Sequence, residues 1–206
     1  MAWRAIKVKD PAGGDGMLRQ YGLSRKEIGL CAGAALPVAG YAWTLVPPLA
    51  ALAAGYMGFT VLVIALVDQR KFIIPDALSL PAIPLGLVAA LSVFPEDWRG
   101  ALQNHLAAAA IAAGVFYVVR LAYRNLRGIE GLGLGDVKLA AAAGTWLGIE
   151  PLPVTLLVAT GAALAAVMLR ALRPREEKMT PQTPVPFGSF LAPSIMIVWF
   201  ARQILG

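Results

Sequence analysis

Residues 131–138 read Gly-Leu-Gly-Leu-Gly-Asp-Val-Lys, so that a carboxylate, Asp136, follows a glycine-rich turn. Long apolar stretches rich in Ala, Leu and Gly recur from about residue 27 to the C-terminus. A second carboxylate, Asp68, directly follows the apolar run at 61–67. An ionisable side chain at the edge of an apolar segment is costly and is therefore a candidate functional residue.

The composition is typical of a membrane protein. Of the 206 residues, 58% are hydrophobic and only 15% are charged, and the mean hydropathy is +0.68. Soluble domains carry about 25% charged residues. We therefore predict an all-α polytopic membrane protein. The single cysteine, Cys31, excludes an intrachain disulfide and a cysteine-cluster zinc site.

Prolines and charged loops divide the apolar sequence into seven segments, which we interpret as about seven transmembrane helices. We expect a six-helix core preceded by one further N-terminal helix. Residues 1–26 are interpreted as a basic cytoplasmic tail and residues 27–206 as one membrane-embedded domain. The segments are 27–46, 49–67, 79–94, 101–123, 137–149, 152–172 and 187–205.

The positive charges predict the orientation. Lys and Arg gather in alternate loops, sixteen on one side and two, Arg99 and Arg202, on the other. Seven spans with a cytoplasmic N-terminus produce this distribution. Asp68 and Asp136 then both lie at the cytoplasmic face. Because the segment after Asp136 is shorter than the roughly 20 residues of a full span, we expect this carboxylate to lie below the headgroups. The net charge of +6 is explained by topology rather than by nucleic-acid binding.

Two carboxylates on separate helices can form an aspartyl protease site. One acts as a base on water, while the other, protonated, polarises the scissile carbonyl. Gly133 and Gly135 remove Cβ atoms before Asp136, which we expect to allow unusual backbone angles and the close approach of a substrate strand. The simpler interpretation is that Asp136 only caps a helix after a flexible loop. The dyad needs no metal or other cofactor.

Four motifs in order resemble the type IV prepilin peptidase family of GxGD intramembrane aspartyl proteases, over about residues 50–200. The first is an Asp at a helix end followed by an aliphatic-Pro-Asp and a Leu-Ser-Leu-Pro run. The second is the GxGD signature with an upstream Glu-Gly and a downstream Lys-Leu. They lie at Ala65–Pro81, Glu130–Leu139, Ala142–Gly148 and Pro186–Pro193.

The resemblance implies that Asp68 and Asp136 are the catalytic dyad of a hydrolase in the cell inner membrane. Such enzymes act in type IV pilus biogenesis and protein secretion by cleaving the basic leader of prepilins and pseudopilins at the cytoplasmic face. The expected substrate has a basic leader, a small residue (Gly) at the cleavage point and an apolar helix behind it. The compact size favours a dedicated Flp/Tad-type pilus peptidase.

The sequence departs from the family at two places. Longer members carry an N-terminal four-cysteine zinc region with N-methyltransferase activity. That region is missing from this sequence, so we expect no methylation activity. In addition, Ser189 stands where many members have a Pro after Phe-Gly. We expect this difference to have little effect on the chemistry.

The remaining polar residues have weaker assignments. Asp76 is either a first-turn acid of its helix or an accessory acid near the dyad. Glu130 contacts the basic leader or is only a solvated charge, and Lys138 pairs with an acidic group or a lipid phosphate. The other interpretations are structural: His105 is a structural residue, Arg120 sets topology and touches anionic lipid, and four tryptophans at outer segment ends are interfacial anchors. These tryptophans are Trp43, Trp98, Trp146 and Trp199.

Two other classes of function are open on the sequence. A small transporter or channel would use Asp68 and Asp136 as ion or proton ligands. No inverted repeat is obvious, which weighs slightly against it. An inactive family member acting as an assembly scaffold is the third interpretation, weakened by the presence of both aspartates.

Overall fold

The computed structural model describes residues 21–128, 131–172 and 186–205, and the described residues form seven α-helices. The helices run α2 (Arg25–Trp43), α3 (Pro48–Lys71), α4 (Asp76–Val93), α5 (Trp98–Arg127), α6 (Leu134–Leu147), α7 (Leu152–Ala171) and α8 (Gly188–Leu205). They match the seven predicted segments, so the all-α fold is confirmed. The predicted tail at 1–26 and Glu130 lie largely or wholly outside the described residues.

Local sequence explains where the helices begin and end. A capping box between Ser24 and Glu27 starts α2. Phe72 has a φ of 54°, and its N–H bonds to the carbonyl oxygen of Asp68, which ends α3. Glycines with positive φ, Gly128 and Gly148, end α5 and α6. These stops place Asp68 in the last turn of one helix, close to the start of the next.

Five of the described helices, α3, α4, α5, α7 and α8, are long and apolar enough to cross a membrane. The protein is therefore a multi-pass membrane protein. Among the described helices, α6 is the shortest, with 14 residues. As predicted from residues 137–149, it is shorter than a full span.

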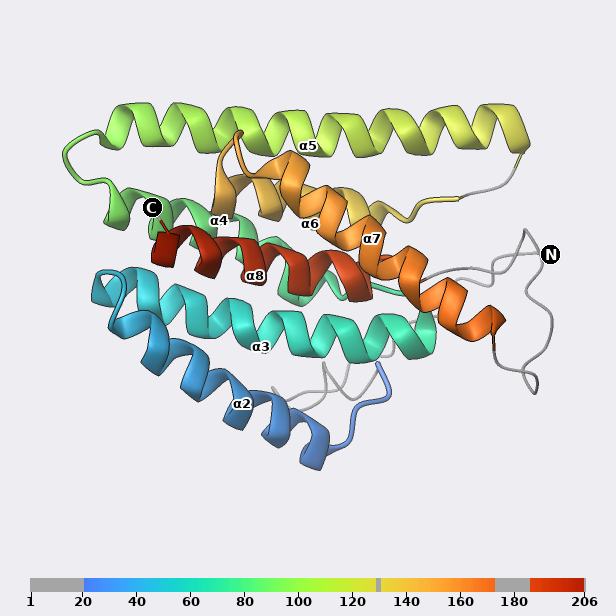
Figure 1. Cartoon of the computed structure of the whole chain (residues 1–206), viewed down its shortest axis with the longest axis horizontal. Helices are drawn as coiled ribbons and strands as arrows, with labels where there is room; N and C mark the ends of the chain where they lie inside the picture. Colours follow the sequence, from blue (N-terminus) through green and yellow to red (C-terminus); the bar gives the residue numbers. More distant parts are fainter. Residues whose placement is uncertain (1–20, 129–130, 173–185, 206) are drawn as a thin grey trace.

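The helices lie side by side with alternating directions (Figure 1). α3 packs against α2, α4 and α8, while α6 packs against α4, α5 and α8. The core between them is rich in alanine, and its larger side chains include Met57, Trp146 and Trp199. In a membrane the hydrophobic effect does not drive helices together. Small residues stabilise the packing there because they allow the helices to approach closely. The N-terminus of α6 and the C-terminus of α3 lie at the same end of the bundle (Figure 1).

The interpretation of four tryptophans as interfacial anchors is wrong for Trp146 and Trp199. Both are only 3% exposed, and their rings meet edge to face, 5.8 Å apart. The indole Nε1 of Trp146 donates to the carbonyl oxygen of Ala82 at 2.9 Å. A Cβ at Gly86 would lie 2.6 Å from this ring, so the missing side chain makes room for it. Trp43 and Trp98 are about half exposed, as an anchor requires.

Candidate active site

Asp68 is held between two helices. It lies in the last turn of α3 and is only 5% exposed. Its Oδ2 accepts hydrogen bonds from the backbone N–H of Ser189 at 2.8 Å and from the Ser189 hydroxyl at 3.3 Å. Because Ser189 is the second residue of α8, Asp68 caps a helix 121 positions further along the chain. The positive end of α8 therefore faces the carboxylate.

Asp136 is the third residue of α6. Its Oδ2 accepts a hydrogen bond from the backbone N–H of Gly133 at 3.1 Å, which is half of a capping interaction. Its Oδ1 is buried and has no hydrogen-bond partner among the described residues. A buried carboxylate oxygen without a protein partner is unusual and calls for an explanation. The capping interpretation is thus correct for one oxygen and leaves the other free for chemistry.

Asp68 and Asp136 line one cavity of about 630 Å³ at this end of the bundle. The charge of Asp68 acts on the carboxyl group of Asp136. The cavity wall also includes the 72–74 segment between α3 and α4 and the 133–135 turn. Two carboxyl groups in one cavity favour a state in which only one is ionised. The structure therefore brings together the two residues that the sequence singled out.

Ile74 packs closely against two segments of the site, at Gly135 and at Gly188. A Cβ at Gly135 would lie 2.8 Å from Ile74 Cβ, and one at Gly188 would lie 2.7 Å from Ile74 Cδ1. The same Cβ at Gly188 would also lie 3.0 Å from Asp68 Oδ2. At Gly135 the close neighbour is Ile74 of the chain itself, and the approach of a substrate strand stays a prediction. The expectation of unusual backbone angles is wrong at Gly133, whose φ is −74°.

Other polar residues line the same cavity. Lys138 Nζ and Asp76 Oδ1 form an ion pair at 2.7 Å, so the partner of this lysine is an acidic group, the first of its two predicted partners. Arg120 also lines the cavity, and its Nη1 donates to the carbonyl oxygen of Leu132 at 3.3 Å. It therefore supports the turn before Asp136, a contact that its assignment to topology and lipid did not include.

Sequence reasoning missed Ser189 as a partner of Asp68. Its hydroxyl lies 3.1 Å from the carbonyl oxygen of Ala65 as well as 3.3 Å from Asp68 Oδ2. The expectation that Ser189 has little effect therefore has to be tested rather than assumed. The available signal was its place after Phe-Gly, where Pro has neither a hydroxyl nor an N–H to donate.

The fold and the cavity define a multi-pass helical protein with a paired-carboxylate site. The sequence profile of the Type IV leader peptidase family matches residues 55–169, a range that includes both carboxylates. The chain belongs to this family, which favours a peptidase over a transporter. No solved structure gives a significant match.

Similar proteins carry the name prepilin leader peptidase/N-methyltransferase. The chain is 38% identical to one from Burkholderia pseudomallei (strain 1026b) over 71% of its own length and 45% of the relative's. It is 30% identical to one from Stutzerimonas stutzeri over 93% of the chain and 62% of the relative. It is 34% identical to one from Dickeya chrysanthemi over 81% of the chain and 56% of the relative. The chain thus spans about half the length of these relatives.

Proposed function

We propose that this protein is a membrane aspartyl endopeptidase that removes the basic leader of type IV prepilins or pseudopilins. The observation that carries the proposal is the pair Asp68 and Asp136, brought from two helices to one cavity. Family membership and the names of the relatives support the choice of substrate.

The two carboxyl groups divide the chemistry between them. The ionised one takes a proton from water, which attacks the carbonyl carbon of the scissile bond. The protonated one donates a hydrogen bond to the carbonyl oxygen, where negative charge develops. The tetrahedral intermediate then collapses, and the leaving amine receives a proton from the dyad. Asp68 keeps its orientation throughout, because two donors from Ser189 hold its Oδ2.

The charges of the chain support an inner-membrane location with a cytoplasmic N-terminus and a cytoplasmic active site. Arg70, Lys71 and Arg127 lie at the ends of the helices that surround the cavity, whereas Arg99 and Arg202 lie at the opposite end of the bundle. Under the positive-inside rule, this distribution supports a cytoplasmic position for the cavity. A leader that stays in the cytoplasm would reach it there.

The test is cleavage of a prepilin-like probe with a basic leader, a glycine at the junction and an apolar helix of about 20 residues. Co-expression with the unaltered chain should shorten the probe on a gel. Asp68→Asn and Asp136→Asn should each abolish shortening while the protein still accumulates in the membrane. Asp97→Asn is the control, since Asp97 caps α5 at the other end of the bundle. Normal processing by stable Asp136→Asn protein would refute the proposal.

A further inference from the structure

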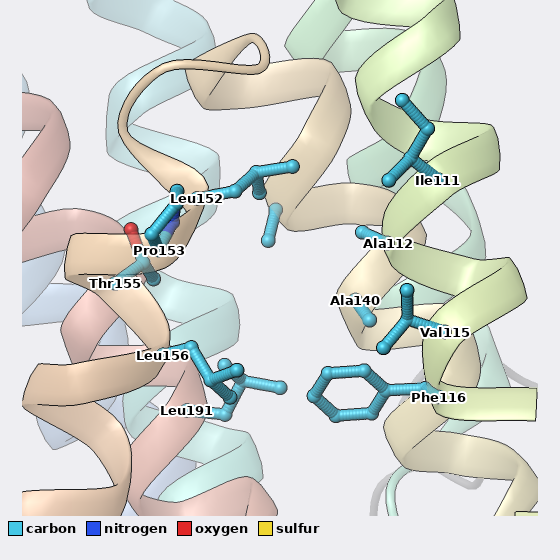
Figure 2. A pocket seen from close by; sticks show the side chains of 11 residues that line it. Ile111, Ala112, Val115, Phe116, Ala140, Leu152, Pro153, Thr155, Leu156 and Leu191 are labelled. Atoms are coloured by element: carbon cyan, nitrogen blue, oxygen red, sulfur yellow. The ribbon is translucent and has the colours of Figure 1, made fainter. Parts of the chain in front are cut away.

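An apolar groove runs along the bundle between α5 and α7. It consists of a cavity of about 240 Å³ and a neighbouring one of about 210 Å³. Val115, Phe116 and Leu156 line both cavities, so the two are parts of one groove. Figure 2 shows the larger part, with side chains of α5 on one wall and those of α7 on the other.

The groove exists because of how the helices pack. α5 packs mainly on α6, and α7 packs mainly on α8, so the two outer helices diverge. The floor between them is made of small or apolar side chains, Ala140 and Ala143 from α6 and Leu191 from α8. The one polar side chain in the lining, Thr155, donates its hydroxyl to the carbonyl oxygen of Pro151 at 2.9 Å. The groove therefore offers apolar contact and no free side-chain hydrogen-bonding group in its lining.

One end of the groove meets the candidate active site. Leu132 and Phe187 line this end. Leu132 directly precedes Gly133, whose N–H binds Asp136. Phe187 directly precedes Gly188, at which a Cβ would lie 3.0 Å from Asp68 Oδ2. An apolar segment in the groove would therefore point one of its ends at the two carboxylates.

We propose that this groove, lined by α5 and α7, binds the apolar helix that follows the cleavage point of the substrate. The proposal rests on the proposed function, which requires a substrate with an apolar helix on one side of the scissile bond. The place of Leu132 and Phe187, each one residue from a segment that contacts a carboxylate, selects this occupant, because a helix seated in the groove has its N-terminal end beside the dyad. A lipid chain or a second copy of the protein gains nothing from a position beside the dyad.

Disulfide cross-linking tests the occupant. Cys31 is the single cysteine and lies on α2, so Cys31→Ala provides a cysteine-free chain. With Asp136→Asn added to retain the probe, cysteines are introduced at Val115 and Leu156 in the groove. Matched cysteines go at Val118 and Leu157, close neighbours outside the lining. The prepilin-like probe carries one cysteine in its apolar helix.

The groove positions should cross-link to the probe several-fold more than the matched positions. The controls are strict, because Val118 and Leu157 are 62% and 71% exposed, compared with 50% and 38% for Val115 and Leu156. Random collision would therefore favour the controls. Equal or reversed yields, no adduct, or adducts mainly between two copies of the enzyme would each overturn the proposal.

Kinetics provide a second measurement in the active chain. Leu156→Trp fills the groove, so it should raise KM for the probe by about tenfold with kcat little changed, whereas Leu157→Trp should change neither. If the unaltered chain cleaves the probe but Leu156→Trp and Leu157→Trp give the same KM, the groove proposal alone is refuted. Absence of cleavage by the unaltered chain would refute the proposed function instead.

Discussion

The two ends of α6 carry polar groups in opposite situations. At the C-terminal end, three side chains bind backbone groups in the last turn of the helix or just after it. His105 Nδ1 lies 2.8 Å from the carbonyl oxygen of Thr145, and Arg202 Nη1 donates to that of Leu147 at 2.7 Å. Asn104 Oδ1 accepts from the N–H of Ile149 at 3.1 Å.

At the N-terminal end, Asp136 satisfies only one donor, and its Oδ1 has no partner in the described part of the chain. The difference shows which end serves stability and which serves chemistry. A polar group that completes a helix end contributes to stability, whereas a buried one left open costs stability and is kept for another purpose. Substitutions at the two ends should therefore separate activity from folding.

The largest effect is expected for Asp136→Asn. Cleavage should fall by about 10⁴-fold, as for other residues that act as a unit in proteolysis. The midpoint of thermal unfolding should not fall, because Asn keeps an oxygen that accepts from the N–H of Gly133 and removes the repulsion between the two carboxyl groups. Purified protein assayed for cleavage and for unfolding on the same sample measures both quantities. A large loss of stability would show that Asp136 mainly stabilises the fold, like the side chains at the C-terminal end of α6.

The next effect concerns Gly188, which lies against both Ile74 and Asp68. Gly188→Ala should lower kcat by about 10²-fold. Ile74 is buried between Gly135 and Gly188, so the new Cβ displaces the carboxylate of Asp68 rather than Ile74. Gly161→Ala on α7 is the matched control, since nothing lies within 4 Å of its added Cβ. Equal activity of the two variants would show that the contact of Gly188 with Asp68 does not position the dyad.

Arg202→Met tests the opposite end. The free energy of unfolding should fall by about 1–3 kcal/mol, because the carbonyl oxygen of Leu147 loses its donor. The cleavage rate per folded molecule should stay unchanged, since Arg202 lies at the other end of α6 from Asp136. Denaturant unfolding and a cleavage assay normalised to folded protein measure the two quantities. A loss of activity without a loss of stability would contradict the division between the two ends.

Much of the fold was predictable from the sequence, because single-segment hydropathy and the positions of prolines set the helices. The shared end of Asp68 and Asp136 follows from counting spans. The contacts between distant segments were not predictable in this way. Ser189 meets Asp68, and Trp146 is buried rather than interfacial, because of packing between helices far apart in sequence. Periodicity within one helix carries no information on such packing.

At the carboxylate end of the bundle, a single hydroxyl group, that of Ser189, also contacts the dyad. This group lies within hydrogen-bonding distance of both Asp68 Oδ2 and the carbonyl oxygen of Ala65. It can donate to an ionised Asp68, or donate to the carbonyl oxygen of Ala65 while accepting a hydrogen bond from a protonated Asp68. Both states of a dyad residue are then accommodated without rearrangement of the backbone, which identifies Ser189 as a positioning residue.

Ser189→Ala should therefore lower kcat by about tenfold with KM unchanged, since the backbone N–H still holds Asp68 and only the hydroxyl is lost. Ser189→Thr keeps the hydroxyl and should restore most of the rate. Steady-state cleavage of the prepilin-like probe measures both constants. A rise in KM, or equal rates for the Ala and Thr variants, would assign Ser189 to helix capping alone and leave Asp68 to be oriented by the N-terminus of α8.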